Sequence, residues 1–124
     1  MLEPWRDDQP IYRQLHERIL GLILKGAIKE GEAIPSVRQV ASDYQINHLT
    51  VAKAYQELVD QGLVEKRRGL GMFVLPGARE QVAASERNKF LTQELPQLLA
   101  RARQLGINED ELIEKISHML KENP

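Results

Sequence analysis

Two helix-forming segments of this sequence are separated by only two residues, Gln45 and Ile46, and so short a connection leaves few folds open. The segment before it runs from Ser36 to Tyr44. The segment after it begins at Asn47, a residue well suited to cap a helix. Two helices joined this tightly must cross steeply, as they do in the helix-turn-helix units of DNA-binding proteins. The sequence therefore predicts a helix-turn-helix.

Periodicity and capping residues predict a helix on either side of the segment that begins at Ser36. The first helix is expected from Pro10 to Lys25, because its apolar residues recur at helical spacing and Gly26 suits a left-handed terminator. In the second helix, Ser36 and Gln39 have capping-box spacing, in which each side chain satisfies a backbone donor of the first turn.

The third helix is expected to have two different faces and to end at Gly62. One face is apolar and suited to burial, and it holds Val51, Ala54, Tyr55, Leu58 and Val59. The opposite face carries Leu49, Lys53, Gln56 and Asp60. A hairpin follows, with strands expected at 63–66 and 72–75 around a turn at 67–71.

Three helices followed by a basic, glycine-containing hairpin have the outline of a winged helix-turn-helix. The expected fold class is therefore mainly α with a small β-hairpin wing (α+β). We expect this domain at residues 1–77 and a helical tail at residues 78–124. In the tail, Pro96 is expected to kink or split a helix near Gln93, and Asn108 is expected to cap a last helix.

This outline predicts where double-stranded DNA would be contacted. A free helix N-terminus attracts phosphate, and a helix fits the major groove. The candidates lie on the start of the second helix, the first turns of the third and the hairpin turn: Arg38, Asn47, His48, Leu49, Thr50, Lys53, Arg67, Arg68, Gly69 and Gly71. Each of these residues, taken alone, could be an ordinary solvated residue without a partner. Leu49 could equally be an apolar contact for a thymine methyl group. Their grouping on one module favours DNA binding.

Four stretches resemble the GntR family of bacterial transcriptional regulators: residues 10–15 (PIYRQL), 34–41 (IPSVRQVA), 47–55 (NHLTVAKAY) and 67–74 (RRGLGMFV). The resemblance covers about residues 10–75 and implies a winged helix-turn-helix that binds DNA. It implies contacts by Arg38, Asn47, His48, Thr50, Lys53, Gly69 and Gly71, with Tyr12, Gln14 and Ser36 as further phosphate-side candidates. Met72 stands where the family more often has threonine, and His48 and Leu49 are expected to tune the operator sequence.

The tail predicts a partner chain. Its two helices are expected to run antiparallel from a turn near Gly106 and to bury one face each against the other. The apolar residues left over have no third layer in the chain: Leu91, Leu95, Leu98, Leu99, Ile113 and Leu120. The short tail resembles that of the YtrA subfamily, which implies dimerisation. A two-fold dimer would present two recognition helices about one DNA turn, ~34–36 Å, or a multiple of it, apart.

These patterns together favour a homodimeric transcriptional regulator, expected to be a repressor that binds a (pseudo)palindromic operator. Two alternatives remain open. The tail could pack back on its own winged domain. The formal net charge of −1 also leaves room for a winged-helix module that binds protein and not DNA.

Other function classes lack their sequence patterns. The three histidines are scattered, and residues 69–71 fit neither a Walker loop nor a dinucleotide fingerprint. Cysteine is absent, which excludes disulfides, thiol nucleophiles and cysteine zinc sites. We therefore expect no enzyme, no cofactor and no metal. No apolar run is long enough to cross a membrane, and the N-terminus lacks the basic and then apolar pattern of a signal peptide. We therefore expect a cytoplasmic protein without a membrane partner. A small-molecule effector is left open.

Overall fold

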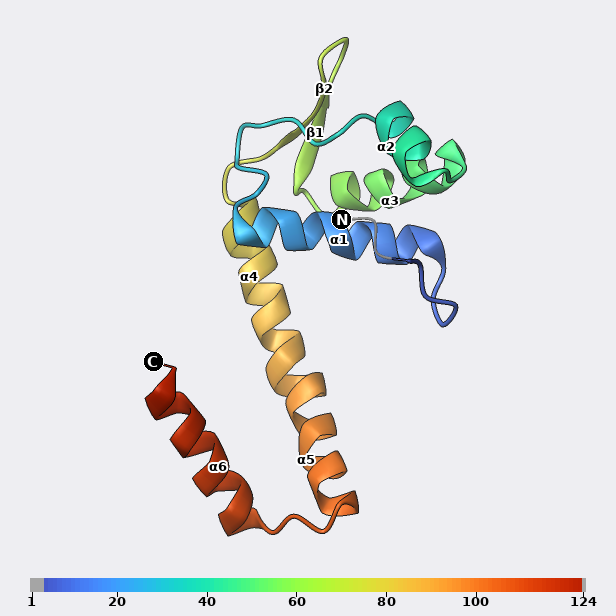
Figure 1. Ribbon diagram of the computed structural model, residues 1–124. Coiled ribbons are helices and arrows are strands. Elements are labelled where there is room, and N and C mark those ends of the chain that lie inside the picture. The colour runs from blue at the N-terminus through green and yellow to red at the C-terminus, as the bar shows by residue number, and fades with distance from the viewer. Residues whose placement is uncertain (1–3, 124) are drawn as a thin grey trace. The chain divides into compact units, whose positions relative to one another are not determined.

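The computed structural model describes residues 4–123, which form two compact units, one ending at Ala84 and the other beginning at Ser85. The elements in chain order are α1 (Ile11–Lys25), α2 (Val37–Tyr44), α3 (His48–Asp60), β1 (Val64–Arg67), β2 (Gly71–Val74), α4 (Ala78–Lys89), the π-helical segment η1 (Phe90–Glu94), α5 (Leu95–Gln104) and α6 (Glu109–Glu122) (Figure 1). A mostly helical chain with one antiparallel hairpin confirms the expected fold class.

The core of the first unit is built around α3, against which α1, α2 and β1 pack. Four residues of the predicted inner face of α3 are buried as expected, Val51, Ala54, Tyr55 and Leu58 at 0–1% exposure, and the fifth, Val59, is half-buried. Val64 and Val74, which pair across the hairpin, close the core on the strand side. Burial of this face holds α3 in one orientation, with its opposite face outward.

The caps that were expected at the helix ends are present. Gly26 ends α1 in the left-handed conformation, with φ 78°. The Ser36 hydroxyl accepts a hydrogen bond from the Gln39 backbone N–H at 3.1 Å, and the Asn47 side chain accepts one from the Leu49 N–H at 2.8 Å. The reciprocal half of the first capping box was predicted wrongly, because the Gln39 amide donates to Asp43 Oδ1 (2.8 Å) instead.

Each strand of the hairpin lies one residue nearer to the turn than expected, at Val64–Arg67 and Gly71–Val74. Arg67 pairs with Gly71, so Arg67 belongs to β1 and the turn holds only residues 68–70. Three-residue turns need a left-handed residue, and Gly69 supplies it with φ 76°. A further strand-like segment was not expected: Ala33 bridges Phe73, and the Ile34 N–H donates to the Met72 carbonyl at 2.9 Å.

The boundary between the units falls after Ala84, later than the expected boundary after residue 77. The first turns of α4 pack into the first unit, where Ala78 and Val82 are buried in the core. Two side chains of α4 also hydrogen-bond that unit: Arg79 Nε donates to the Leu24 carbonyl (3.0 Å), and Gln81 Nε2 donates to the Gln61 carbonyl (2.7 Å).

In the second unit, a break in the α-helix lies where proline predicted it. Pro96 has no N–H and its ring crowds the carbonyl of Thr92, so the turn before it widens into the π-helical segment Phe90–Glu94. The Thr92 hydroxyl donates to the Asn88 carbonyl at 2.7 Å. The last helix begins as expected, because Asn108 Oδ1 accepts the Glu111 N–H at 2.8 Å.

The expected packing of the two tail helices on each other is wrong. No side chain of α6 is buried, and in α5 only Ala102 is. The ribbons of α5 and α6 run in opposite directions on the two sides of the loop that connects them (Figure 1). An apolar groove lies between them, lined by residues that include Leu99, Ile107, Leu112 and Ile116.

Candidate nucleic-acid interface

The N-terminus of α3 is exposed and capped. Asn47, His48 and Leu49 are exposed and Thr50 is half-buried. The Asn47 side chain accepts a hydrogen bond from the Leu49 N–H, and the Asn47 backbone carbonyl accepts one from the Thr50 N–H at 3.0 Å. This cap fixes the first turn of the helix. The positive end of the helix dipole is thereby presented at the surface together with polar side chains, an arrangement suited to bind phosphate.

The two-residue connection depends on a left-handed Gln45, with φ 54° and ψ 49°. Its conformation ends α2 and lets the Ile46 N–H donate to the Ala41 carbonyl at 3.1 Å. A second contact holds α3 in place: the buried Tyr55 hydroxyl donates a hydrogen bond to the Pro35 carbonyl at 2.6 Å. Burial raises the pKa of Tyr55, so the hydroxyl keeps the proton that it donates. The Ile46 bond ties the connection to α2, and the Tyr55 bond joins α3 to the residues just before α2.

Lys53 on the outer face of α3 is held against α1. Its Nζ lies 3.9 Å from the centroid of the Tyr12 ring, which is a cation–π contact. Arg13, next to Tyr12, lies with Nη2 3.5 Å from Glu57 Oε1, so a second contact joins α1 to α3. Lys53 stays exposed and Tyr12 is half-buried. The ammonium is therefore restrained without being withdrawn from solvent.

The start of α2 carries an exposed cation. Arg38 lies in the first turn, directly after the Ser36 cap, and its side chain is exposed. The Ser36 oxygen accepts the cap hydrogen bond, and the residue remains at the surface. Because α2 and α3 pack on one another, both helix starts belong to the same rigid core.

The hairpin presents one restrained and one exposed arginine. Arg67 Nε donates to Glu65 Oε1 at 3.0 Å, and its guanidinium lies 4.3 Å from the Phe73 ring centroid, so Arg67 is held on the strand face. Arg68 is exposed in the turn beside Gly69. Gly71 has φ 113°, a conformation that favours glycine.

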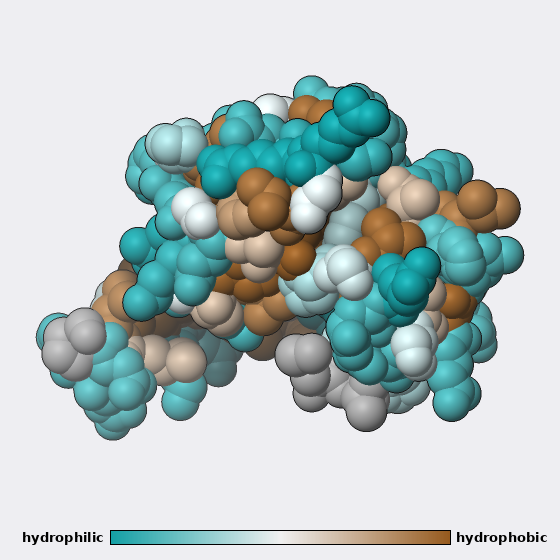
Figure 2. Space-filling view, turned by 90° about the horizontal axis from the view of Figure 1, so that it is seen from above, coloured by the Kyte–Doolittle hydropathy of each residue, from teal (hydrophilic) through white to brown (hydrophobic). Residues whose placement is uncertain are grey.

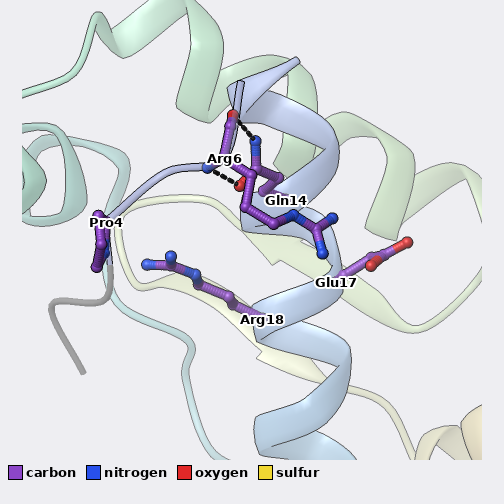
Figure 3. Close-up of a pocket in the computed structure, with 5 residues that line it drawn as sticks. All are labelled: Pro4, Arg6, Gln14, Glu17 and Arg18. Atoms are coloured by element: carbon purple, nitrogen blue, oxygen red, sulfur yellow. Dashed lines mark hydrogen bonds between the residues drawn. The ribbon is translucent and has the colours of Figure 1, made fainter. Parts of the chain in front are cut away.

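Gln14 does not fit its expected role as a phosphate-side candidate. It is buried, and its amide is used within the protein (Figure 3). Oε1 accepts the Arg6 N–H at 2.8 Å, while Nε2 donates to the carbonyls of Arg6 and Gln9 at 2.8 Å each. Gln14 therefore fastens the segment before α1. Pro4, Glu17 and Arg18 complete the pocket drawn in Figure 3.

One exposed residue of this unit was missed by sequence reasoning. Leu70 lies in the hairpin turn and is 71% exposed. The signal for it is an apolar residue between two glycines, at a turn where a polar residue is usual.

The surface on the hairpin side is mixed. Viewed from that side, hydrophilic residues cover most of the face, and hydrophobic residues reach the surface in separate places (Figure 2). Within residues 4–123, the titratable side chains form no group of three that could hold a metal ion. In the same range, no helix combines the length and apolar composition that a bilayer crossing requires.

Comparison with known proteins agrees with this geometry. Residues 11–74 match the family described as "Bacterial regulatory proteins, gntR family". The chain is 33% identical over 117 residues to the HTH-type transcriptional repressor YtrA of Bacillus subtilis, covering 94% of this chain and 86% of YtrA.

Two solved structures are similar as well. A transcriptional regulator from Oenococcus oeni has a TM-score of 0.79 at 30% identity, over 95% of this chain and 97% of that one. AraR(DBD) in complex with operator ORX1 has a TM-score of 0.52 at 32% identity, over 58% of this chain and 88% of that one. The present chain therefore belongs to the gntR family of bacterial regulatory proteins, and over nearly its whole length it resembles the repressor YtrA.

Proposed function

We propose that this protein is a sequence-specific transcriptional repressor that binds a (pseudo)palindromic operator as a homodimer. In this proposal the start of α3 enters the major groove, and the hairpin turn reaches the neighbouring minor groove. One observation carries it: the capped start of α3 is exposed, with His48, Leu49 and Lys53 outward, while four of the five apolar residues on the opposite face are buried. YtrA, which is named a repressor, and the AraR(DBD)–operator complex support it.

Local cations would supply the attraction to DNA. The chain as a whole has a formal charge of −1, so the positive electrostatic potential that attracts DNA must come from particular residues. Arg38, Lys53 and Arg68 are exposed on elements of one unit, and each is able to reach a phosphate or a base edge. We expect binding to weaken with salt, by a slope of about −0.9 for each phosphate neutralised.

A second copy of the tail would explain its exposed apolar residues. Leu91, Leu98, Ile113 and Leu120 are 48–66% exposed, Leu99 lies at 36%, and Leu95 is half-buried. Each large side chain that a partner covers would contribute up to ~1.5–3 kcal/mol. Pairing of two tails would also place two copies of α3 to read two half-sites.

Removing two cations tests the contact surface. The probe is the duplex that the protein selects from a random-sequence library, and its binding is measured by fluorescence anisotropy. We expect Arg38→Ala with Lys53→Ala to weaken binding about tenfold or more and to reduce the salt slope. The control, Lys25→Ala with Arg87→Ala, removes the same charge from exposed residues elsewhere and should bind nearly as the parent does.

Two results would count against the proposal. Unchanged binding by the Arg38 and Lys53 variant would show that the contact surface lies elsewhere. If no duplex were selected at all, while the folded protein captured another protein, a winged-helix protein-interaction module would replace the DNA-binding function.

A further inference from the structure

Leu49 stands out on the surface of the first unit. It is 75% exposed, at the second position of α3. Within the described part of this unit, residues 4–84, only Leu49 and Leu70 are exposed large hydrophobic residues; the others lie from Phe90 onward. A protein partner usually binds a contiguous apolar patch. A single isolated leucine is suited to a small apolar partner.

The backbone beneath Leu49 is held in place. Its N–H donates to Asn47 Oδ1 at 2.8 Å, and two residues later Val51 is buried at 0% exposure. The helix register therefore directs Leu49 outward from the same end of α3 that carries the cap. Lys53, one turn further on, extends toward the Tyr12 ring at 3.9 Å and is restrained there.

The chemistry of the major groove limits what such a side chain can contact. The base edges present hydrogen-bond donors and acceptors, and their one apolar group is the 5-methyl of thymine. Covering a polar edge with leucine would remove it from water without a replacement hydrogen bond, which is unfavourable. Contact with a methyl group has no such penalty and buries apolar surface on both sides.

We infer that Leu49 reads the 5-methyl group of a thymine, so that each half of the operator contains a thymine opposite Leu49. The inference rests on the proposed function, because it requires α3 to lie in the major groove. It adds the identity of one base, and it names the group on that base that is recognised.

Deoxyuridine tests the inference, because it differs from thymidine only by that methyl group. In the duplex selected from a random library, each thymine is replaced singly by deoxyuridine, and the Kd is measured. For the parent protein we expect one position in each half-site to weaken binding about fourfold, the factor that corresponds to ~0.8 kcal/mol for one buried methyl group. Replacing both should weaken it about sixteenfold.

Three variants connect the effect to Leu49. Leu49→Ala should bind thymidine and deoxyuridine duplexes equally, whereas Leu49→Met, which keeps an apolar side chain, should still distinguish them. Leu70→Ala is the matched control, because Leu70 is almost equally exposed and lies on the hairpin; it should retain the full deoxyuridine effect. Both changed positions, Leu49 and Leu70, are at the surface, so circular dichroism should show unchanged folding for all three variants.

The outcomes separate this inference from the function on which it rests. Specific binding without a deoxyuridine effect, or with an effect that Leu49→Ala leaves in place, would overturn the inference and leave DNA binding intact. Failure to select any duplex would overturn the proposed function itself.

Discussion

Gln45 is the residue on which the tight connection depends. Among the described residues it is the only non-glycine with positive φ, at 54°. For an L-residue this conformation costs roughly 1–2 kcal/mol, because Cβ approaches the following carbonyl oxygen. The sequence located the turn between the segment that ends at Tyr44 and the Asn47 cap. It did not reveal which residue would be left-handed, since glutamine has no special preference for that region.

Relieving this strain should stabilise the fold. We expect Gln45→Gly to raise the free energy of unfolding by about 0.5–1 kcal/mol in urea denaturation, because glycine takes positive φ without a Cβ clash. The control is Gln56→Gly, the same change at an exposed position inside α3, which should lower it by about 1 kcal/mol. A loss of similar size at both positions would contradict the role assigned to Gln45.

Single site residues were predictable only where helix periodicity decides their direction. Leu49 and Lys53 face outward because the other side of α3 is apolar and buried, and that pattern is visible in the sequence. Gln14 lies on a helix too, yet its partners are backbone groups of Arg6 and Gln9, outside the helix. No periodic pattern indicates such a contact.

Among the elements, local capping signals placed the helix starts, whereas the strand ends depend on where the hairpin turn closes and on one long-range bridge. The hairpin differs by one residue from expectation because the turn closes between Arg67 and Gly71 around Gly69. The bridge between Ala33 and Phe73 joins segments forty residues apart, and no local sequence pattern predicts it.

The tail helices were predicted by the same local signals, but their packing was not. An apolar stripe specifies that a helix face will be covered; it does not specify whether its own chain or a second copy covers it. The structure leaves α6 without buried side chains, so the predicted pairing of α5 with α6 is not formed.

Charged substitutions at the exposed apolar residues of α5 and α6 test whether the tail forms the dimer. Leu98→Glu with Ile113→Glu, one change on each helix, should convert a dimer into a monomer in sedimentation equilibrium, because burying the carboxylates is unfavourable. Arg101→Glu with Lys115→Glu places the same groups at exposed polar positions and should remain dimeric. A monomeric parent protein, or a first variant that stays dimeric, would contradict dimerisation through these residues.

In the molecule as a whole, we propose different tasks for the two units. The unit ending at Ala84 has a closed core and an exposed helix start, and we assign DNA recognition to it. The unit beginning at Ser85 has almost no buried side chains, and we assign dimerisation to it. The sequence predicted two parts with a boundary after residue 77, and the two compact units meet later, after Ala84, because Ala78 and Val82 belong to the first core.

DNA binding by the start of α3 is best tested by an NMR titration of the ¹⁵N-labelled protein with its selected operator duplex. If the start of α3 lies in the groove and the hairpin turn beside it, the backbone amides of residues 47–53 and 68–71 should show the largest chemical-shift changes. The amides of residues 20–26, at the far end of α1, should change little. Large changes at that far end, with residues 47–53 unaffected, would show that the start of α3 does not bind the duplex.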